Sequence, residues 1–339
     1  MKQVAAQLGV STATVSNAYN RPDQLSEKLR ERILRESAEL GYYGPNLAAR
    51  SLRRGESGVI GVMLADSISY SFSDPVANQL MQGIAEVLVE NKKQLLLLSS
   101  GMTSAEQSSA ESLPDGFILY GALQGNGFEH IKRTGKPVVV VDFEFADSGS
   151  VNIDNEQGAY NIAEHALQKE DNSQVAVLGL RLIDSSRICR LSQEDLSMPS
   201  QEISRLRLAG YMRAAEANKV SIPVDKIWHI PINSPEKAEV AAREALTSSP
   251  LPTVLLCMSD VIALAALRVA NELNIAVPGQ VQVTGFDDIP EASRSTPPLS
   301  TVCQQNLEKG RLAATMLLEG NSKEKVILET RLVVRQTCK

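Results

Sequence analysis

The sequence lacks the features of a membrane-embedded or secreted protein. Its longest apolar runs, such as residues 95–98 and 138–141, are far too short to cross a bilayer. Met1 leads directly into a polar, helix-like pattern without the apolar core of a signal peptide. The cysteines have no metal-ligand spacing, so neither a disulfide framework nor a zinc site is indicated; they are Cys189, Cys257, Cys303 and Cys338. We therefore expect a cytoplasmic protein that makes no contact with a membrane.

Catalytic constellations are missing as well. No Ser-His-Asp or Cys-His arrangement is signalled, and the glycine-containing stretch 121–127 lacks the spacing and the lysine of a phosphate loop. We interpret the adjacent Asp287 and Asp288 as one ligand contact and one helix cap, and not as a pair of catalytic carboxylates. The histidines stand in unremarkable surroundings; they are His130, His165 and His229. We expect no enzyme activity, metal or cofactor, and an α/β enzyme is the less favoured alternative.

Length and charge indicate a multidomain chain whose charge is unevenly distributed. The sequence has 339 residues, 43% of them hydrophobic and 22% charged, which is typical of a soluble globular protein with two or three domains. The net charge is −6, yet residues 1–56 carry nine Lys/Arg against six Asp/Glu. A small basic head on a larger acidic body is the polarity expected when only the head meets nucleic acid.

The first 20 residues predict two helices joined by a tight turn. Val4 and Leu8 share one helical face, Gly9 suits the positive φ of a turn, and Ser11 is placed to cap a second helix that runs through Tyr19. This spacing is what a helix-turn-helix needs. The second helix would present short polar or methyl groups to a DNA groove; they are Thr12, Ala13, Ser16 and Asn17.

A third helix is predicted from Ser26, with Gly41 as its stop. Its expected apolar face comprises Leu29, Ile33, Ser37 and Leu40. The alternative interpretation of residues 1–41 is a small helical cap with a solvated polar face.

Residues 46–54 form a short helix-capable segment between Pro45 and Gly55. Nine residues cannot hold a helix in water, so this segment should order only against a partner. Leu52 flanked by Arg50, Arg53 and Arg54 resembles an apolar wedge among phosphate-seeking charges, which suits the minor groove. A plain interdomain linker is the alternative.

The head resembles the LacI/GalR family of bacterial repressors. The matching motifs are VAAQLGVS at 4–11, TVSN at 14–17, GY at 41–42 and NLAARSLR at 46–53. The resemblance implies that Thr12, Ala13 and Asn17 read bases, and that Ser11, Ser16 and Asn20 contact phosphates. It also implies that paired hinge helices enter the minor groove and that Leu52 wedges a base step open; the implied hinge contacts are Asn46, Ala49, Arg50, Leu52 and Arg53.

The body alternates short branched-apolar runs with helix patterns, which predicts parallel sheets flanked by helices on both faces. Strands are expected at 59–64, 94–99, 116–120, 137–141, 175–180, 226–230, 253–258, 281–286 and 328–334. Helices are expected at 75–91, 157–168, 203–218, 235–248, 260–273 and 306–318.

Polar residues just beyond these strands indicate a ligand site, because ligands of parallel sheets bind at the carboxyl ends of the strands. Carboxylates and an arginine can bond hydroxyls while Tyr70 and Phe72 stack a ring, which is the chemistry of sugar or nucleoside binding. For each acidic residue alone, a helix cap or turn role is the alternative. The residues concerned are Asp66, Asp142, Arg207, Ser259, Asp260, Asp287 and Asp288.

The body also resembles the effector domain of the same family, which is similar to periplasmic sugar-binding proteins. The matching motifs are VNIDNEQGA at 151–159, RLRLAGY at 205–211, SD at 259–260, VTGFDDIP at 283–290 and TPPLSTV at 296–302. The resemblance implies two α/β lobes crossed three times by the chain. It implies that Arg207 and Asp287 clamp ligand hydroxyls and that Asp260 caps its helix; the other implied lining residues are Asp66, Phe72, Asp142 and Ser259.

Together these patterns predict an all-α helix-turn-helix head at 1–44, a hinge helix and linker at 45–57, and a two-lobed effector-binding and dimerisation domain at 58–339. We expect a homodimeric repressor that binds double-stranded operator DNA under control of a small sugar or nucleoside-like effector. A polar insert at 182–201 and a lengthened loop at 67–73 leave the ligand unidentified. The alternatives are control by a protein corepressor, with a vestigial cleft, or a solute-binding protein.

Overall fold

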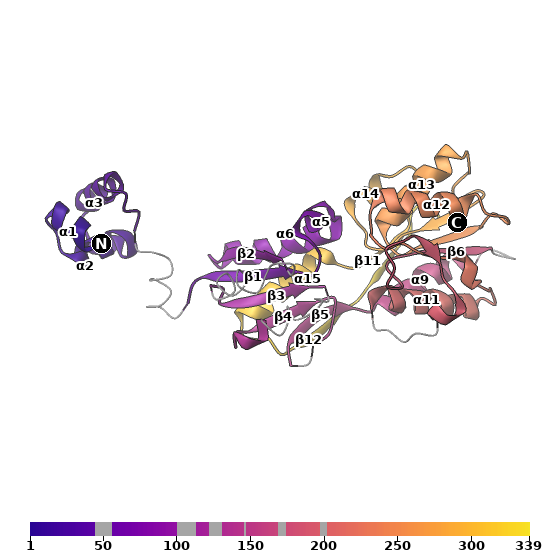
Figure 1. Ribbon diagram of the computed structural model, residues 1–339, viewed down its shortest axis with the longest axis horizontal. Coiled ribbons are helices and arrows are strands. Elements are labelled where there is room, and N and C mark those ends of the chain that lie inside the picture. The colour runs from indigo at the N-terminus through magenta and orange to yellow at the C-terminus, as the bar shows by residue number, and fades with distance from the viewer. Residues whose placement is uncertain (45–55, 100–112, 122–130, 146, 169–173, 197–201) are drawn as a thin grey trace.

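The computed structural model describes residues 1–44, 56–99, 113–121, 131–145, 147–168, 174–196 and 202–339. The predicted hinge contacts therefore lie outside the described residues; they are Asn46, Ala49, Arg50, Leu52 and Arg53. The N-terminal part is a small all-α unit (Figure 1). Its helices are α1 (Lys2–Leu8), α2 (Thr12–Asn20), the 3₁₀ turn η1 (Pro22–Gln24) and α3 (Glu27–Glu39).

The helix-turn-helix forms at the turn and cap residues that the sequence predicts. Gly9 ends α1 with φ +65°, and the Ser11 side chain accepts the Thr14 N–H to cap α2. Leu40 departs from its prediction: it is 43% exposed, because α3 ends at Glu39 and the apolar face ends with Ser37. The core of the head comprises Val4, Ala5, Leu8, Val15, Ala18 and Ile33.

The body contains two parallel sheets, as the alternating pattern predicts. In lobe 1 the strand order is β12-β5-β4-β3-β1-β2, all parallel. These strands are β1 (Val59–Leu64), β2 (Gln94–Ser99), β3 (Gly116–Tyr120), β4 (Val138–Val141), β5 (Gly149–Ile153) and β12 (Lys325–Leu328). Helices α5 (Ile68–Ser73), α6 (Pro75–Glu90) and α15 (Asn306–Leu318) accompany this sheet.

Lobe 2 has the order β10-β9-β6-β8-β7, in which only β7 is antiparallel to its neighbour. Its strands are β6 (Val175–Gly179), β7 (Cys189–Arg190), β8 (Ile227–His229), β9 (Val254–Cys257) and β10 (Gln282–Thr284). Its helices are α9 (Asn155–Leu167), α10 (Gln193–Leu196), α11 (Ile203–Ala217), the 3₁₀ turn η2 (Val224–Lys226), α12 (Pro235–Leu246), α13 (Asp260–Glu272) and α14 (Pro290–Arg294).

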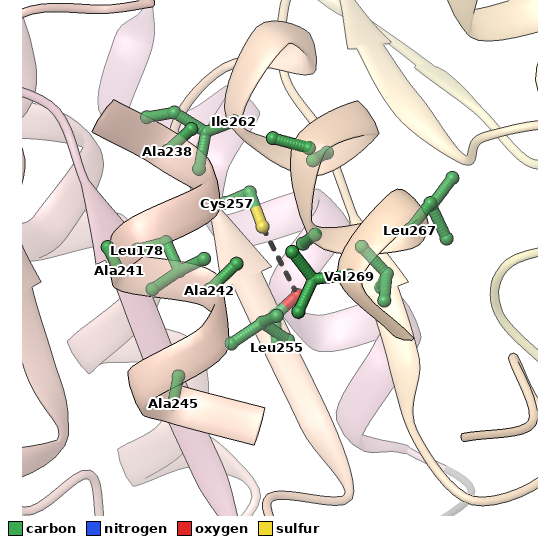
Figure 2. Packing of buried hydrophobic residues seen from close by; sticks show 14 of the residues in the cluster. Leu178, Ala238, Ala241, Ala242, Ala245, Leu255, Cys257, Ile262, Leu267 and Val269 are labelled. Atoms are coloured by element: carbon green, nitrogen blue, oxygen red, sulfur yellow. Dashed lines mark hydrogen bonds between the residues drawn. The ribbon is translucent and has the colours of Figure 1, made fainter. Parts of the chain in front are cut away.

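Alternate residues of the buried strands face opposite helix layers. In β6, Val175 and Val177 pack toward α9 and α11, whereas Ala176 and Leu178 pack toward α12 and α13. Small side chains let these helices approach the sheet closely, as Figure 2 shows for the alanines of α12 above Leu255 and Cys257. The lobe 2 sheet therefore lies between two helix layers, and α6 and α15 pack against one face of the lobe 1 sheet. Parallel sheets flanked by helices confirm the predicted fold class.

The chain crosses between the lobes three times. It leaves lobe 1 after β5, returns through β11 (Thr301–Cys303) to α15 and β12, and enters β13 (Arg331–Val333), which pairs with β11. The single strand expected at 328–334 is therefore wrong. Leu328 ends a lobe 1 strand and Arg331 begins a strand of the crossing sheet, because the last crossing separates them.

In the described residues, no helix combines the length and the apolar character that a membrane span requires. The same residues hold no group of three or more side chains arranged to bind a metal ion.

Candidate functional site

The N-terminal end of α2 is the exposed end of the predicted recognition helix. Ser11, Thr12 and Ala13 are all exposed there. The Ser11 hydroxyl lies 2.8 Å from that of Thr14 and accepts the Thr14 N–H at 3.0 Å. A helix N-terminus with exposed short side chains is suited to phosphate and base-edge contact.

The other three predicted α2 contacts already have partners within the head. The Asn17 amide donates to Gln24 Oε1 at 3.1 Å. The Asn20 amide donates to the Ser16 carbonyl at 3.0 Å and to the Ser16 hydroxyl at 3.3 Å. These side chains are partly buried, and their internal bonds leave the Asn17 Oδ1 and the Ser16 O–H available for a contact with DNA.

Two of the basic residues counted in the head hold its helices together. Arg30 donates to the Ala18 carbonyl at 3.3 Å, and Arg32 donates to the Leu8 carbonyl at 3.0 Å while pairing with Glu36. Each guanidinium thus bonds a carbonyl near the end of another helix. The other Lys and Arg residues of 1–44 are all exposed; they are Lys2, Arg21, Lys28 and Arg35.

In the body, the polar residues beyond the strands meet where the lobes face each other. A continuous hydrogen-bonded chain, which we call the interlobe cluster, runs from β4 of lobe 1 to α11 of lobe 2. Its members are Asp142, Lys309, Gln304, Asp287, Arg207 and Asn155.

The lobe 1 end of the cluster is a buried ion pair. Lys309 on α15 is 0% exposed, and its ammonium lies 2.8 Å from each oxygen of Asp142, which follows β4. The third ammonium donor goes to Gln304 Oε1 at 2.9 Å. Gln304 lies in the crossing between β11 and α15, and its amide donates to Asp287 at 2.6 Å.

The lobe 2 end is centred on Arg207 of α11. Its Nε donates to Asn155 at 3.0 Å, and one terminal nitrogen reaches the Met258 carbonyl at 2.5 Å and Asp287 at 3.4 Å. The guanidinium lies 3.6 Å above the ring of Phe286. Burial raises the pKa of Asp287, and the Arg207 charge opposes that rise. Arg207 and Asp287, both expected to contact a ligand, form a buried ion pair with each other.

Ser259, and not Asp260, caps α13. Ser259 caps α13 by accepting the Ile262 N–H at 3.1 Å, and its hydroxyl donates to Asn233 at 2.7 Å. Asp260 does not cap α13; it accepts the Ile289 N–H at 2.9 Å and the Thr301 hydroxyl at 2.5 Å. Burial raises the Asp260 pKa to about 6. Asp260 therefore ties α13 to β11 and the loop before α14.

Tyr70, and not Phe72, is the aromatic residue that joins the lobes. Phe72 is 67% exposed, whereas the Tyr70 hydroxyl donates to the Asn233 carbonyl of lobe 2 at 3.3 Å. Both residues lie on the short helix α5, and because they are two positions apart their side chains leave the helix in different directions. Partial burial, followed by the carboxylates of Asp74, Asp66 and Asp287, raises the pKa of Tyr70. Asp66 is itself exposed, and its carboxylate is one of the charges that raise the pKa of the Tyr70 hydroxyl.

The insert at 182–201 is attached to lobe 2 over its described part. His229 Nδ1 accepts the Leu182 N–H at 3.0 Å, and Nε2 lies 2.9 Å from the Ser185 carbonyl. Strand β7 then pairs with β8, and Arg190 stacks on Trp228 at 4.9 Å. The insert thus extends the sheet edge.

Sequence reasoning missed several members of this site. Lys309 had a detectable signal, because it stands four residues before Ala313 on the buried side of α15, where a charge is unexpected. Asn155 stood inside a recognised motif. No local signal marked the others, which are Asp74, Asn233, Gln304 and Asn306.

Comparisons with known proteins agree with this architecture. Residues 1–46 match the family described as "Bacterial regulatory proteins, lacI family", and residues 187–338 match "Periplasmic binding protein-like domain". A Corynebacterium glutamicum LacI-family regulator of known structure is 27% identical, with a TM-score of 0.72 over 100% of this chain and 98% of that chain. The complex of the regulator CelR with cellobiose is 24% identical, with a TM-score of 0.69 over 98% of both chains.

Curated relatives are similar over nearly their full length. An HTH-type transcriptional regulator of Mycobacterium tuberculosis is 37% identical over 94% of this chain and 90% of its own. IpsA of Corynebacterium glutamicum is 31% identical over 98% and 94%, respectively. The ribose operon repressor of Haemophilus influenzae is 26% identical over 99% and 98%. These relatives are named as regulators and not as enzymes, and the chain belongs to the lacI family of bacterial regulatory proteins.

Proposed function

We propose that this chain is a cytoplasmic homodimeric repressor whose operator affinity is set by a small polyhydroxylated effector bound between the lobes. Residues 1–44 are the DNA-binding head, 45–57 the hinge, and 58–339 the effector-binding and dimerisation domain. The observation that carries the proposal is the interlobe cluster, because it joins side chains from both lobes through the segments where the chain crosses.

Two further contacts couple the lobes to this cluster. The Asn306 amide, at the start of α15, donates to Gln79 of α6 at 2.8 Å and to the Asp287 carbonyl at 3.3 Å. Val76, at the start of α6, packs against buried apolar residues of lobe 2. A ligand that changes the lobe-to-lobe contact therefore also acts on α6 and α15.

The hinge joins lobe 1 just before β1, so a lobe movement changes the spacing of the two hinges in a dimer. A coupling free energy of about 1–3 kcal/mol would change operator affinity roughly 5- to 150-fold. The sugar class of effector is supported by the CelR–cellobiose complex, and the repressor role by the ribose operon repressor.

On DNA, we propose that Thr12, Ala13 and Asn17 contact bases and that Ser11, Ser16 and Asn20 contact phosphates. In the hinge we propose that Leu52 is the minor-groove wedge; the accompanying contacts are Asn46, Ala49, Arg50 and Arg53. In the body the proposed effector contacts are Arg207, Asp287, Asp142, Ser259 and Asp66. Tyr70 replaces Phe72 as the aromatic contact.

Selection of bound sequences from random duplex DNA tests the first half of this function. The full chain should enrich a near-palindromic site, and Leu52→Ala should weaken binding to that site without changing the thermal stability of the body. Lys323→Ala, outside the proposed contacts, is the control and should bind like the wild type. Absence of any sequence preference would contradict the function.

A second candidate is control by a protein corepressor instead of a small ligand. It is favoured by the extent to which the charges of the interlobe cluster already pair within the protein, Arg207 with Asp287 and Lys309 with Asp142, with side chains at most 6% exposed. A thermal-shift screen of sugars, polyols and nucleosides against the full chain separates the two. Stabilisation by a compound, lost in Arg207→Gln, supports the effector; no stabilisation by any compound supports the corepressor.

A further inference from the structure

The chain is fastened to lobe 1 at the end of the proposed hinge, 45–57. Asp115, which directly precedes β3, accepts three hydrogen bonds from the residues that lead into β1. Its Oδ1 accepts the Ser57 N–H at 2.6 Å and the Ser57 hydroxyl at 2.8 Å, and its Oδ2 accepts the Gly58 N–H at 2.8 Å. One carboxylate therefore fixes the point where the hinge enters lobe 1.

The main chain holds the same point from both sides. The Gly58 carbonyl accepts the Gln94 N–H of β2 at 2.7 Å, and the Val59 carbonyl accepts the Asp115 N–H at 2.7 Å. Partial burial alone would raise the pKa of Asp115, but the hydrogen bonds that it accepts and the charge of Lys93 lower this pKa below its ordinary value. The carboxylate is therefore ionised at neutral pH, and its charge-assisted hydrogen bonds are stronger than neutral ones.

Lys93 connects this point to helix α6. Its ammonium lies 3.5 Å from the Glu56 carboxylate and 3.8 Å from Asp115 Oδ2, and its side chain is 23% exposed. Its N–H donates to the Leu88 carbonyl, in the last turn of α6, at 2.9 Å. We call the residues that meet here the hinge clasp; they are Glu56, Ser57, Gly58, Lys93 and Asp115. The hinge clasp thus joins the end of the hinge to the end of α6.

The other end of α6 lies at the contact between the lobes. Val76 packs against lobe 2, and Gln79 accepts a hydrogen bond from the Asn306 amide, which also donates to the Asp287 carbonyl of lobe 2. The helix has 16 residues, so it spans about 24 Å. A packed helix is a rigid element that can couple events at its two ends. A displacement at the lobe contact therefore reaches the hinge clasp.

We infer that Lys93 and Asp115 are positioning residues that transmit a lobe movement from α6 to the hinge. This inference rests on the proposed function and names the place where lobe 1 holds the hinge. Neither residue is among the proposed DNA or effector contacts, so both act through the position that they give to residues 56–58. A hinge that is not held must be ordered when the operator binds, which costs conformational entropy, and it no longer follows the lobes.

Operator affinity tests the positioning role of Lys93. The probe is the duplex that the full chain enriches from random DNA, beside a scrambled duplex of the same length. Lys93→Met should bind the enriched duplex about tenfold more weakly than the wild type, whereas Lys93→Arg, which keeps the charge, should retain the affinity. Lys92→Met removes the same charge from the exposed neighbouring residue and is the control. Lys93→Met and Lys92→Met should bind the scrambled duplex equally, because the head is unchanged. Equal affinity of these two variants for the enriched duplex would overturn the inference.

Asp115→Asn is an independent variant of the hinge clasp. Asparagine keeps one acceptor for Ser57, but it loses the charge, and its NH₂ group cannot accept the Gly58 N–H. We expect operator affinity to fall at least about tenfold. Asp147→Asn, in the exposed turn before β5, should cause no loss. Thermal unfolding establishes that each variant is folded, and the Lys93 variants decide the question if Asp115→Asn is not. A folded Asp115→Asn chain with wild-type operator affinity would also overturn the inference.

A double-mutant cycle tests the transmission, which a purely structural role of the hinge clasp would not affect. Tyr70→Phe removes the hydroxyl that donates to the Asn233 carbonyl of lobe 2, so it perturbs the lobe contact without any ligand. It should change operator affinity at least about threefold in the wild type and in Lys92→Met. In Lys93→Met more than half of this free-energy change should be lost, because substitutions at distant sites add unless the sites are coupled. The same change in all three backgrounds, or no change in any, would contradict transmission through the hinge clasp. A chain that enriches no duplex would contradict the proposed function, and the inference with it.

Discussion

The fully buried Lys309 gives the sharpest prediction on stability. The proposed change is Lys309→Met, which keeps a helix-forming side chain of similar length and removes only the charge and its hydrogen bonds. The change leaves the Asp142 carboxylate, whose side chain is 6% exposed, without its cation. Removal of one partner from a buried ion pair costs about 3–5 kcal/mol, because the remaining charge is neither solvated nor paired.

Thermal unfolding followed by circular dichroism measures this cost. A loss of about 3–5 kcal/mol corresponds to a fall of roughly 6–20 °C in Tm for a domain of this size. Lys325→Met is the matched control, because its pair with Glu144 lies in the same lobe with side chains 54% and 52% exposed. An exposed pair contributes less than about 1 kcal/mol, so the control should unfold near the wild-type temperature.

A double variant tests whether the unpaired Asp142 charge causes the loss of stability. In Lys309→Met with Asp142→Asn, no buried charge is left unpaired, and asparagine tolerates the φ of +65° at position 142. The double variant should regain more than half of the lost stability. If Lys309→Met unfolds like Lys325→Met, or if Asp142→Asn brings no recovery, the orphaned-charge reasoning is refuted.

Two other predictions concern the packing of lobe 1 and the insert of lobe 2. A Cβ on Gly310 of α15 would collide with the Leu80 carbonyl of α6, so Gly310→Ala should cost about 1–3 kcal/mol in urea unfolding. The control Gly279→Ala, whose Cβ would lie 3.3 Å from Ala276, should cost less, and equal losses would contradict this close packing. The His229 ring is neutral in the fold, since Nδ1 accepts from Leu182, and burial lowers its pKa below 6.5. Below pH 6.5 the imidazole of the unfolded chain binds a proton that the folded ring does not. The free energy of unfolding should therefore decrease as the pH is lowered, by up to about 1.4 kcal/mol per pH unit. This slope should be smaller in His229→Gln between pH 7.5 and 5.0, and identical slopes would remove His229 as its source.

Much of the fold could be predicted because its signals are local. The turn glycine at 9, the cap at Ser11 and the alternation of apolar strands with helices each depend on neighbouring residues. Strands with strong apolar runs, such as β1 and β4, were therefore expected at nearly the observed bounds. The short strands β7 and β11 were missed, because they are defined by pairing with distant segments.

The site was predicted in part for the same reason. The end of a strand can be found in sequence, so Asp142, Ser259 and Asp287 were identified, and family resemblance added Arg207. The direction of a side chain on α5 cannot be found that way. Tyr70 and Phe72 were both expected near a ligand, and family resemblance added only Phe72 to the lining, but Tyr70 makes the contact with lobe 2 and Phe72 is exposed. Likewise, the choice of Ser259 over Asp260 as the cap of α13 depends on where Ile289 and Thr301 lie.

The sequence by itself determined the helical head, the α/β body and the family, because helix caps, turn glycines and apolar periodicity act over a few residues. Only the tertiary structure decided which charges are matched. Lys309 and Asp142 are 167 positions apart, and Arg207 and Asp287 are 80 apart. Each pair lies within one lobe and forms only when that lobe has folded and burial has removed water from between the two groups, so the pairing of these charges is a property of the fold and not of any one segment.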